Sequence, residues 1–300
     1  MSLKAALDPK VRALCNPVVI GSGAAIKAHA QACGLPLRNV EVLELGPGEF
    51  TIGEIHAAHG RAAIAAAQRA IRGAAAGDYG AVVAAPHSET AIHAAGIEFD
   101  GYASFVARTL GLPPEEAILM LCFEYAGREV RIAHVTLHTS VSAALKLITQ
   151  ERVLRTIRAV DDALKRLGYR RPRIGVSGLN PHAGEGGLFG DEEQKVIAPA
   201  VEQARSENVS VDGPIGADIL IQRAGYDAYV VMLHDQGHIP AKVLAPNGAA
   251  ALTIGTPVLF SSVAHGAAFD IAGRNLADPA AMVEAITRLV SHRRRAPQTR

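Results

Sequence analysis

Short apolar runs alternate with helical stretches from one end of the chain to the other. The strand candidates are rich in Val and Ile and nearly continuous in apolarity, as parallel strands covered on both faces are; they span 16–20, 79–85, 129–137, 173–177, 228–233 and 258–263. Helical periodicity and end signals predict helices over 61–76, 142–167 with a break near residue 150, 191–206 and 278–291. Gly77 is expected to end the first helix, and Asp278 followed by Pro279 to begin the last. This alternation predicts an α/β fold with a mostly parallel sheet.

Composition narrows the class of protein. The chain has 300 residues, enough for two domains of roughly 150 residues each. Hydrophobic residues are 49% and charged residues 20%, so a full core is expected rather than disorder. The net charge of +1 and the 4% aromatic content give no basis for nucleic-acid binding. No apolar stretch approaches the roughly 18 residues that a membrane span needs, and the charged start lacks a signal-peptide pattern, so we expect a cytoplasmic protein.

Histidines follow five of the predicted strands. They are His87, His138, His182, His234 and His265. In open α/β sheets, ligands bind outside the carboxyl ends of the strands. Five imidazoles placed at that edge therefore predict a functional cleft, although any one of them alone is more often a packed or capping residue.

Three of these histidines are the first beyond their strands. We expect His138, His182 and His234 to hold a metal ion, because catalytic zinc sites combine three protein ligands with an open position. Asp218 and Asp235 lie near the same edge and are expected to orient a hydroxyl or a metal-bound imidazole, with helix capping as the competing reading. Lys242 is an anion clamp or proton donor in this hypothesis, against the default of a surface lysine.

Two motifs resemble one enzyme family closely. The segments 178–186 (GLNPHAGEG) and 234–237 (HDQG) are similar to those of the 4-hydroxythreonine-4-phosphate dehydrogenases, and the resemblance runs from about Lys4 to Ala280. It implies an isocitrate/isopropylmalate-dehydrogenase-like fold, a homodimer, NAD and a divalent metal. It also implies that the metal is held by histidines from both subunits, at His138, His182 and His234 in this chain. Three imidazoles suit zinc first, with iron, cobalt, nickel or magnesium as alternatives.

The cofactor segment follows from the same resemblance. No GxGxxG loop is present, since Gly21 and Gly23 lack a third glycine at the needed spacing. Residues 265–274 are instead similar to the adenosine-binding loop of the wider isopropylmalate dehydrogenase superfamily, and the positions carried over are His265, Gly266, Asp270, Gly273 and Arg274. We expect a nucleotide-side domain of residues 1–104 plus 246–300, and a metal and substrate domain of residues 105–245.

The substrate positions depart from the phosphate-specific pattern. A His-Thr pair of the family is matched by Tyr102 and Ala103, its Asn and Arg by Ala251 and Phe260, and only the lysine is kept, as Lys242. The expected pocket is therefore more aromatic and less cationic, which suits a flatter, more apolar substrate.

One branch of the family fits such a pocket. The strings 86–93 (PHSETAIH), 134–138 (HVTLH), 234–242 (HDQGHIPAK) and 244–248 (LAPNG) resemble the terephthalate cis-dihydrodiol dehydrogenases. These enzymes oxidise 1,2-dihydroxy-3,5-cyclohexadiene-1,4-dicarboxylate to protocatechuate with loss of CO₂. The strand and Gly-Asp-Pro loop with which the family begins have no counterpart here, so either the start is truncated or the element is lacking.

Three rival functions stay open on the sequence. The first is a dehydrogenase of a four-carbon sugar-acid phosphate, such as 4-phosphohydroxythreonine, threonate phosphate or erythronate phosphate. The second is a metal-dependent hydrolase that activates water at the three-histidine site, and the third is a non-catalytic metal- or ligand-binding protein. Reduction of the nicotinamide separates the dehydrogenases from the other two.

Overall fold

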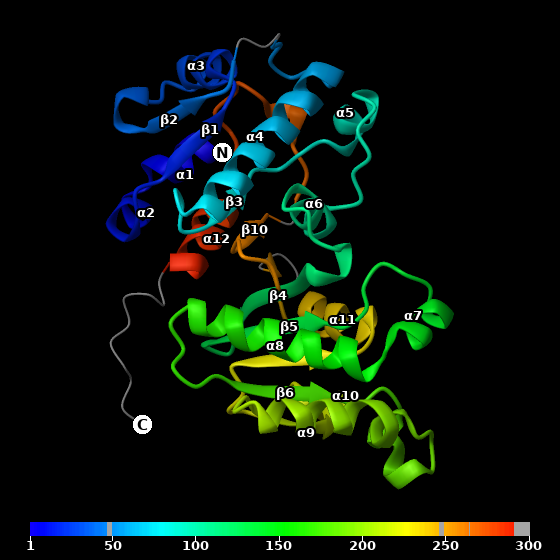
Figure 1. Ribbon diagram of the computed structural model, residues 1–300. Coiled ribbons are helices and arrows are strands. Elements are labelled where there is room, and N and C mark those ends of the chain that lie inside the picture. Colours follow the sequence, from blue (N-terminus) through cyan, green and yellow to red (C-terminus); the bar gives the residue numbers. More distant parts are fainter. Residues whose placement is uncertain (47–49, 246–248, 264, 291–300) are drawn as a thin grey trace. The chain divides into compact units, whose positions relative to one another are not determined.

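The computed structural model describes residues 1–46, 50–245, 249–263 and 265–290, and the chain divides into two compact units (Figure 1). Unit 1 consists of Met1–Pro114 and the described chain from Pro257 onward; unit 2 is Glu115–Thr256. The chain passes from one unit to the other after Pro114 and after Thr256, later than the expected boundaries at 104 and 246. The reason is that strands β4 (Ile118–Tyr125) and β9 (Ala250–Ile254) pair with each other and both belong to unit 2.

Unit 1 contains two pairs of parallel strands, covered by helices. Strand β1 (Val18–Gly21) pairs with β2 (Glu41–Glu44), and β3 (Val82–Ala84) pairs with β10 (Phe260–Ser262). Its helices are α1 (Ser2–Leu7), α2 (Pro9–Leu14), α3 (Gly23–Ala32), α4 (Ala57–Ala76), α5 (Glu89–Ala94), α6 (Tyr102–Thr109) and α12 (Ala280–Val290). One hydrophobic cluster joins α4, α5, α6, β3 and β10 and includes Ile71, Ile92, Val106 and Phe260. Tyr102, one of the predicted ring-binding residues, packs against this cluster.

Unit 2 is a six-stranded arrangement in the order β9-β4-β5-β8-β6-β7. Its further strands are β5 (Arg128–His134), β6 (Arg173–Ser177), β7 (Ser210–Ile215) and β8 (Ala228–Val231), and its helices are α7 (Val141–Leu147), α8 (Gln150–Arg166), α9 (Ala198–Ser206), α10 (Ala217–Leu220) and α11 (His234–Leu244). A π-helical turn, Glu193–Ile197, precedes α9. Strands β5, β8, β6 and β7 are parallel, so their carboxyl ends share one edge; β4 runs antiparallel to both of its neighbours.

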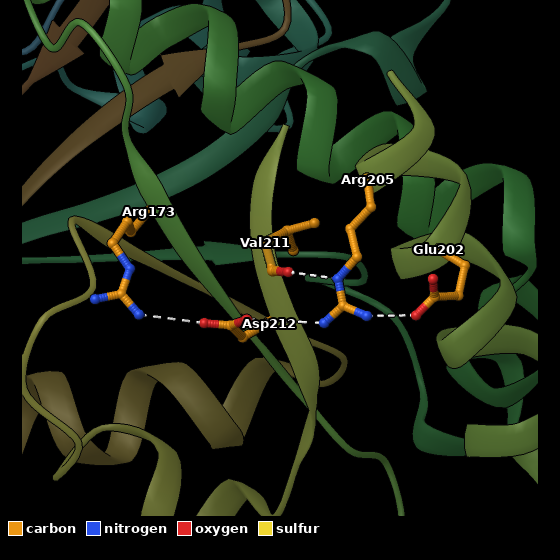
Figure 2. Close-up of polar contacts among 5 residues, drawn as sticks. All are labelled: Arg173, Glu202, Arg205, Val211 and Asp212. Carbon is orange, nitrogen blue, oxygen red and sulfur yellow. Dashed lines mark hydrogen bonds and ion pairs between the residues drawn. The ribbon is translucent and has the colours of Figure 1, made fainter. Parts of the chain in front are cut away.

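Polar contacts fix the opposite edge of this sheet, where β6 and β7 begin (Figure 2). The Arg205 side chain of α9 donates to the backbone carbonyl of Val211 at 2.9 Å and also pairs with Glu202. Asp212 lies between two guanidinium groups, 3.4 Å from Arg173 and 3.7 Å from Arg205. These exposed pairs each contribute less than about 1 kcal/mol, but together they hold α9 against the start of β7.

The expected elements are largely present. Strand 173–177 is found at its predicted bounds, the other five predicted strands overlap observed ones, and the stretch 142–167 is broken into α7 and α8 near residue 150. Gly77 ends α4 with φ 90° as predicted, while α4 begins four residues earlier than expected, capped by His56. Asp278 accepts from the backbone of Ala280 at 2.9 Å, as the cap prediction requires. The predicted helix end at 291 and residues 246–248 lie outside the described residues.

Four strands were not predicted: β2, β4, β7 and β9. Strand β4 reads ILMLCFEY, and its Leu and Met lack the Val and Ile enrichment that marks the other strands. Strand β2 is short and exposed at both ends, and β7 contains Gly213 and Pro214, residues that usually argue against a strand. The antiparallel β4 follows from no local pattern, because strand direction depends on which neighbours it meets. Among the described helices, none is long and apolar enough to cross a bilayer.

Candidate active site

Two of the predicted metal ligands lie together at the carboxyl edge of unit 2. His138 follows β5, and His234 is the first residue of α11, which follows β8. Strands β5 and β8 are parallel neighbours, with His134 opposite Val231 at their ends, so the segments that follow emerge side by side. The ring centroids of His138 and His234 are 5.9 Å apart. Both side chains reach solvent, and the pair forms the accessible part of the candidate centre.

Asp235 orients the second of these imidazoles. Its carboxylate lies 2.7 Å from Nδ1 of His234. Because a carboxylate only accepts hydrogen bonds, Nδ1 carries the proton and the lone pair of Nε2 is left for a ligand. Aspartate behind a metal-binding histidine is a common arrangement that fixes the tautomer and the ring direction. The role of Asp235 behind a metal ligand stays a prediction.

His182 lies in a loop with an unusual backbone conformation. Every residue from His182 to Gly187 has a positive φ, including the non-glycine residues His182, Ala183 and Glu185. The His182 ring contacts Phe189 at a centroid distance of 6.4 Å, and its backbone lies beside Gly216, against which the exposed Asp218 also packs. Positive φ is costly for side chains with a Cβ, so this conformation is retained against strain.

The three-ligand set is not assembled within one chain. In the part of the chain that the structure describes, no three His, Cys, Asp or Glu side chains are placed to hold one metal ion. His138 and His234 place two imidazoles near each other, with ring centroids 5.9 Å apart. The ligand set therefore stays a prediction, as does its origin in two subunits.

A buried glutamate, missed by sequence reasoning, organises the His182 loop. Glu193 is 3% exposed, and Oε1 accepts hydrogen bonds from the backbone N–H groups of Leu179 and Asn180, both at 2.7 Å. The Asn180 side chain donates to Oε2 at 2.9 Å. Burial by itself raises the pKa of the Glu193 carboxyl, but the hydrogen bonds from Asn180 and Leu179 outweigh it, and the pKa is lowered overall.

We expect Glu193→Gln to destabilise the fold by about 1–3 kcal/mol at neutral pH, because its donors lose a charged acceptor and one of them faces the amide NH₂ group instead. A carboxyl with a lowered folded-state pKa contributes stability above its ordinary value of 4.5 and loses it as pH falls through the folded value. Urea unfolding of both proteins at neutral pH and well below 4.5 checks this. The difference should shrink in acid; a constant difference would contradict an ionised Glu193.

Two further histidines, His134 and His238, lie next to His234. His134 is 3% exposed; burial, and next the neighbouring His238, lower its pKa to about 3, so its ring is neutral. His238 Nδ1 lies 3.2 Å from His134 Nε2, and the His238 ring is stacked on that of His234 at 3.8 Å with an interplanar angle of 8°. Burial also lowers the pKa of His238. In the sequence, the i, i+4 spacing of His234 and His238 in HDQGH was the signal that both rings would lie on one face of a helix.

The predicted cofactor segment borders a large cavity of unit 1. The cavity has a volume of about 1470 Å³, and its lining includes His265, Gly266 and Gly273. Asp270 and Arg274 lie in the same segment and are exposed. An open, mostly apolar cavity of this size can receive a ligand as large as a dinucleotide. Cofactor binding by these residues stays a proposal.

An aromatic cluster forms part of the same lining. The ring of Tyr102 is 4.9 Å from that of Phe260 and 4.8 Å from that of His87, between centroids. Burial raises the pKa of Tyr102 to about 12, so its hydroxyl stays protonated. Phe260 is fully buried. Ala103 adjoins this cluster on α6, whereas Ala251 on β9 and the exposed Lys242 on α11 belong to unit 2.

Comparisons with known proteins cover nearly the whole chain. A family model described as Pyridoxal phosphate biosynthetic protein PdxA matches residues 13–289. The 1,2-dihydroxy-3,5-cyclohexadiene-1,4-dicarboxylate dehydrogenase of Comamonas sp is 44% identical over 275 residues, which cover 90% of this chain and 86% of that protein. The D-threonate 4-phosphate dehydrogenase of Cupriavidus necator is 38% identical over 306 residues, covering 95% of this chain and 90% of that protein.

Solved structures show the same fold. A 4-hydroxythreonine-4-phosphate dehydrogenase from Burkholderia phymatum has a TM-score of 0.83 at 35% identity, covering 97% of this chain and 92% of that one. A terephthalate 1,2-cis-dihydrodiol dehydrogenase from Burkholderia xenovorans LB400 has a TM-score of 0.79 at 39% identity, covering 96% and 93% of the two chains. The α/β fold class expected from the sequence is confirmed.

Proposed function

Because this chain belongs to the family of the pyridoxal phosphate biosynthetic protein PdxA and is a dehydrogenase, we propose that it oxidises a cyclic cis-dihydrodiol. The proposed substrate is 1,2-dihydroxy-3,5-cyclohexadiene-1,4-dicarboxylate, and the products are protocatechuate, CO₂ and reduced NAD. The dehydrogenase of Comamonas sp, which is 44% identical to this chain, is named for this substrate. The proposal also assigns a divalent metal, zinc first, and a homodimer.

The observation that carries the proposal is the aromatic contact between Tyr102 and Phe260. Their rings lie 4.9 Å apart, at positions where the resemblance places a histidine and an arginine in phosphate-specific members. Phe260 is buried and Tyr102 is partly exposed. Two neutral rings offer no charge to a phosphate dianion and favour a flat hydrocarbon ring. Replacing hydrogen-bonding groups by rings changes specificity between such substrates by orders of magnitude.

The metal would be held by His138 and His234 of one chain and by His182 of a second copy. When bound, a divalent cation supplies Lewis acidity to a hydroxyl that is being oxidised and to the carbonyl that forms. Asp235 holds His234 in the tautomer that such a site needs. Exposed apolar side chains beside these residues, among them Leu188 at 72% and Val141 at 66%, support burial of this region against another subunit.

The chain's own residues divide the remaining tasks. The 265–274 segment would bind NAD, whose oxidised ring takes up the hydride that leaves the carbinol carbon. Lys242 would contact the departing carboxylate and so orient the substrate, or would relay a proton to the product. Asp218 would orient a substrate hydroxyl from its position beside the His182 loop. Loss of CO₂ from the β-keto acid then restores the aromatic ring.

We expect rapid NAD reduction when protein, Zn²⁺ and NAD are mixed with the dihydrodiol, and a rate at least about a hundredfold lower with 4-phosphohydroxythreonine or D-threonate 4-phosphate. Absorbance of reduced nicotinamide and release of CO₂ and protocatechuate are measured together. The reverse preference would establish the sugar-acid phosphate function, which the 38% identity to the Cupriavidus necator enzyme favours. No reduction with any of them, with no NAD binding by titration, would leave the hydrolase and binding-protein hypotheses.

A further inference from the structure

We infer that His238 accepts a hydrogen bond from a substrate hydroxyl through Nε2, and that buried His134 is the positioning residue that fixes its tautomer. The substrate part rests on the proposed function; the tautomer part rests on the geometry of unit 2 alone. Neither residue belongs to the predicted ligand set, and the mechanism above leaves both without a task.

The hydrogen-bond chain begins at a backbone carbonyl. Nδ1 of His134 lies 3.3 Å from the carbonyl oxygen of Leu119. A carbonyl only accepts, so the single proton of neutral His134 is on Nδ1 and Nε2 presents a lone pair. This lone pair faces Nδ1 of His238 at 3.2 Å. Nδ1 of His238 is also 3.3 Å from the carbonyl oxygen of His234.

His238 therefore faces two acceptors with the same nitrogen. Its Nδ1 must carry the proton, because neither the His134 lone pair nor the carbonyl of His234 can donate. In the neutral ring this leaves Nε2 as an unprotonated acceptor. The hydrogen-bond chain from Leu119 through His134 to His238 has one consistent direction, so the backbone carbonyl of Leu119 sets the tautomer of His238.

A glycine makes the approach of these two histidines feasible. Gly237 is buried where α11 crosses the end of β5, and a Cβ on it would lie 2.3 Å from Nε2 of His134 and 2.9 Å from Cγ2 of Ile132. Any larger residue would push the helix or the buried ring away. The absence of a side chain at 237 thus brings His238 within hydrogen-bond distance of His134.

The stacking of His238 on His234 indicates whether His238 is a metal ligand or a hydrogen-bond acceptor. The rings of His234 and His238 are parallel within 8° at 3.8 Å. The lone pair of a ring nitrogen lies in the plane of its ring. Ligands of one cation point their lone pairs at a common centre, which two stacked and nearly parallel planes cannot share. If His234 binds the metal, His238 is left beside it as an acceptor for a group held there. Lys242 lies one further turn along the same face of α11. A substrate with a diol and a carboxylate could therefore place a hydroxyl at His238 and the carboxylate at Lys242.

The tautomer is tested on the ligand-free protein. We expect ¹⁵N-histidine NMR to show both His134 and His238 with the proton on Nδ1, assigned by loss of signals in the variants. In His134→Leu, the His238 signals should shift toward a mixture of tautomers. A His238 with its proton on Nε2 in the wild-type protein would overturn the inference, and this readout requires no substrate, metal or turnover.

Two conservative variants separate the two nitrogens of His238. In His238→Asn the amide reproduces Nδ1 donation but not the Nε2 acceptor; in His238→Gln the amide oxygen reaches the position of Nε2. We expect KM for the oxidised substrate, and Kd for protocatechuate titrated in the presence of Zn²⁺, to rise about tenfold to a hundredfold in the Asn variant. The Gln variant should stay within about fivefold of wild type, since an acceptor is kept.

His93→Asn on exposed helix α5 is the matched control and should change neither constant. Equal effects of Asn and Gln, or an unchanged KM and Kd in the Asn variant, would overturn the acceptor role. If the wild-type protein binds protocatechuate but oxidises no dihydrodiol, the proposed function fails while the Kd comparison still decides the role of His238.

Discussion

Replacing His182 by alanine is expected to remove the bound metal and the dehydrogenase activity together. The loss of one of three ligands should weaken metal affinity by far more than the roughly tenfold to hundredfold change that follows loss of a supporting residue behind a ligand. Metal content after dialysis and NAD reduction are measured on the same preparation. His93→Asn serves as the control for handling, because it lies on an exposed helix of unit 1.

A mixture of two inactive variants tests where His182 acts. If one chain supplies His138 and His234 and its partner supplies His182, a heterodimer of His182→Ala and His234→Ala contains one intact site. Equal mixing after dissociation should then recover about a quarter of the wild-type activity, since half of the dimers are mixed and each has one working site. Stoichiometric metal and full turnover in His182→Ala would refute the ligand assignment; no recovery in the mixture would refute the shared site.

Phe260→Arg is expected to abolish dihydrodiol turnover and to destabilise unit 1. The side chain is fully buried in the cluster with Ile92 and Val106, so the guanidinium has no water around it. An uncompensated buried charge costs about 3–5 kcal/mol, which is a large part of the stability of a domain. Urea unfolding and kcat/KM for the dihydrodiol measure the two effects separately.

Phe260→Leu is the control that preserves burial without charge. It should cost less than half as much stability, since it removes ring volume only, while still raising KM for a ring-shaped substrate because the contact with Tyr102 at 4.9 Å is lost. An Arg variant with unchanged unfolding free energy would show that residue 260 reaches solvent. Unchanged kcat/KM in both variants would remove Phe260 from the substrate pocket.

The sequence predicted the features that depend on local pattern. Runs of Val and Ile marked strands in both units. His138 and His234 were found as the first histidines beyond the predicted strands 129–137 and 228–233, because parallel strands deliver their carboxyl ends to one edge. The motif at 178–186 identified the His182 loop. Asp218 was chosen for its position near the same sheet edge, Lys242 for its position after His234, and the 265–274 segment from the family resemblance; their roles remain proposals.

Tertiary structure alone decided the rest. Four features depend on residues far apart in the chain or on how closely two elements approach. They are the antiparallel direction of β4, the hydrogen bonds of Glu193 to the His182 loop, the burial of Phe260 and the contact between His134 and His238. Periodicity reports which face of a strand or helix is apolar, but it carries no information about the partner opposite that face. His134 and His238 are 104 residues apart, and their hydrogen bond exists because Gly237 lets a helix pack closely on a strand end.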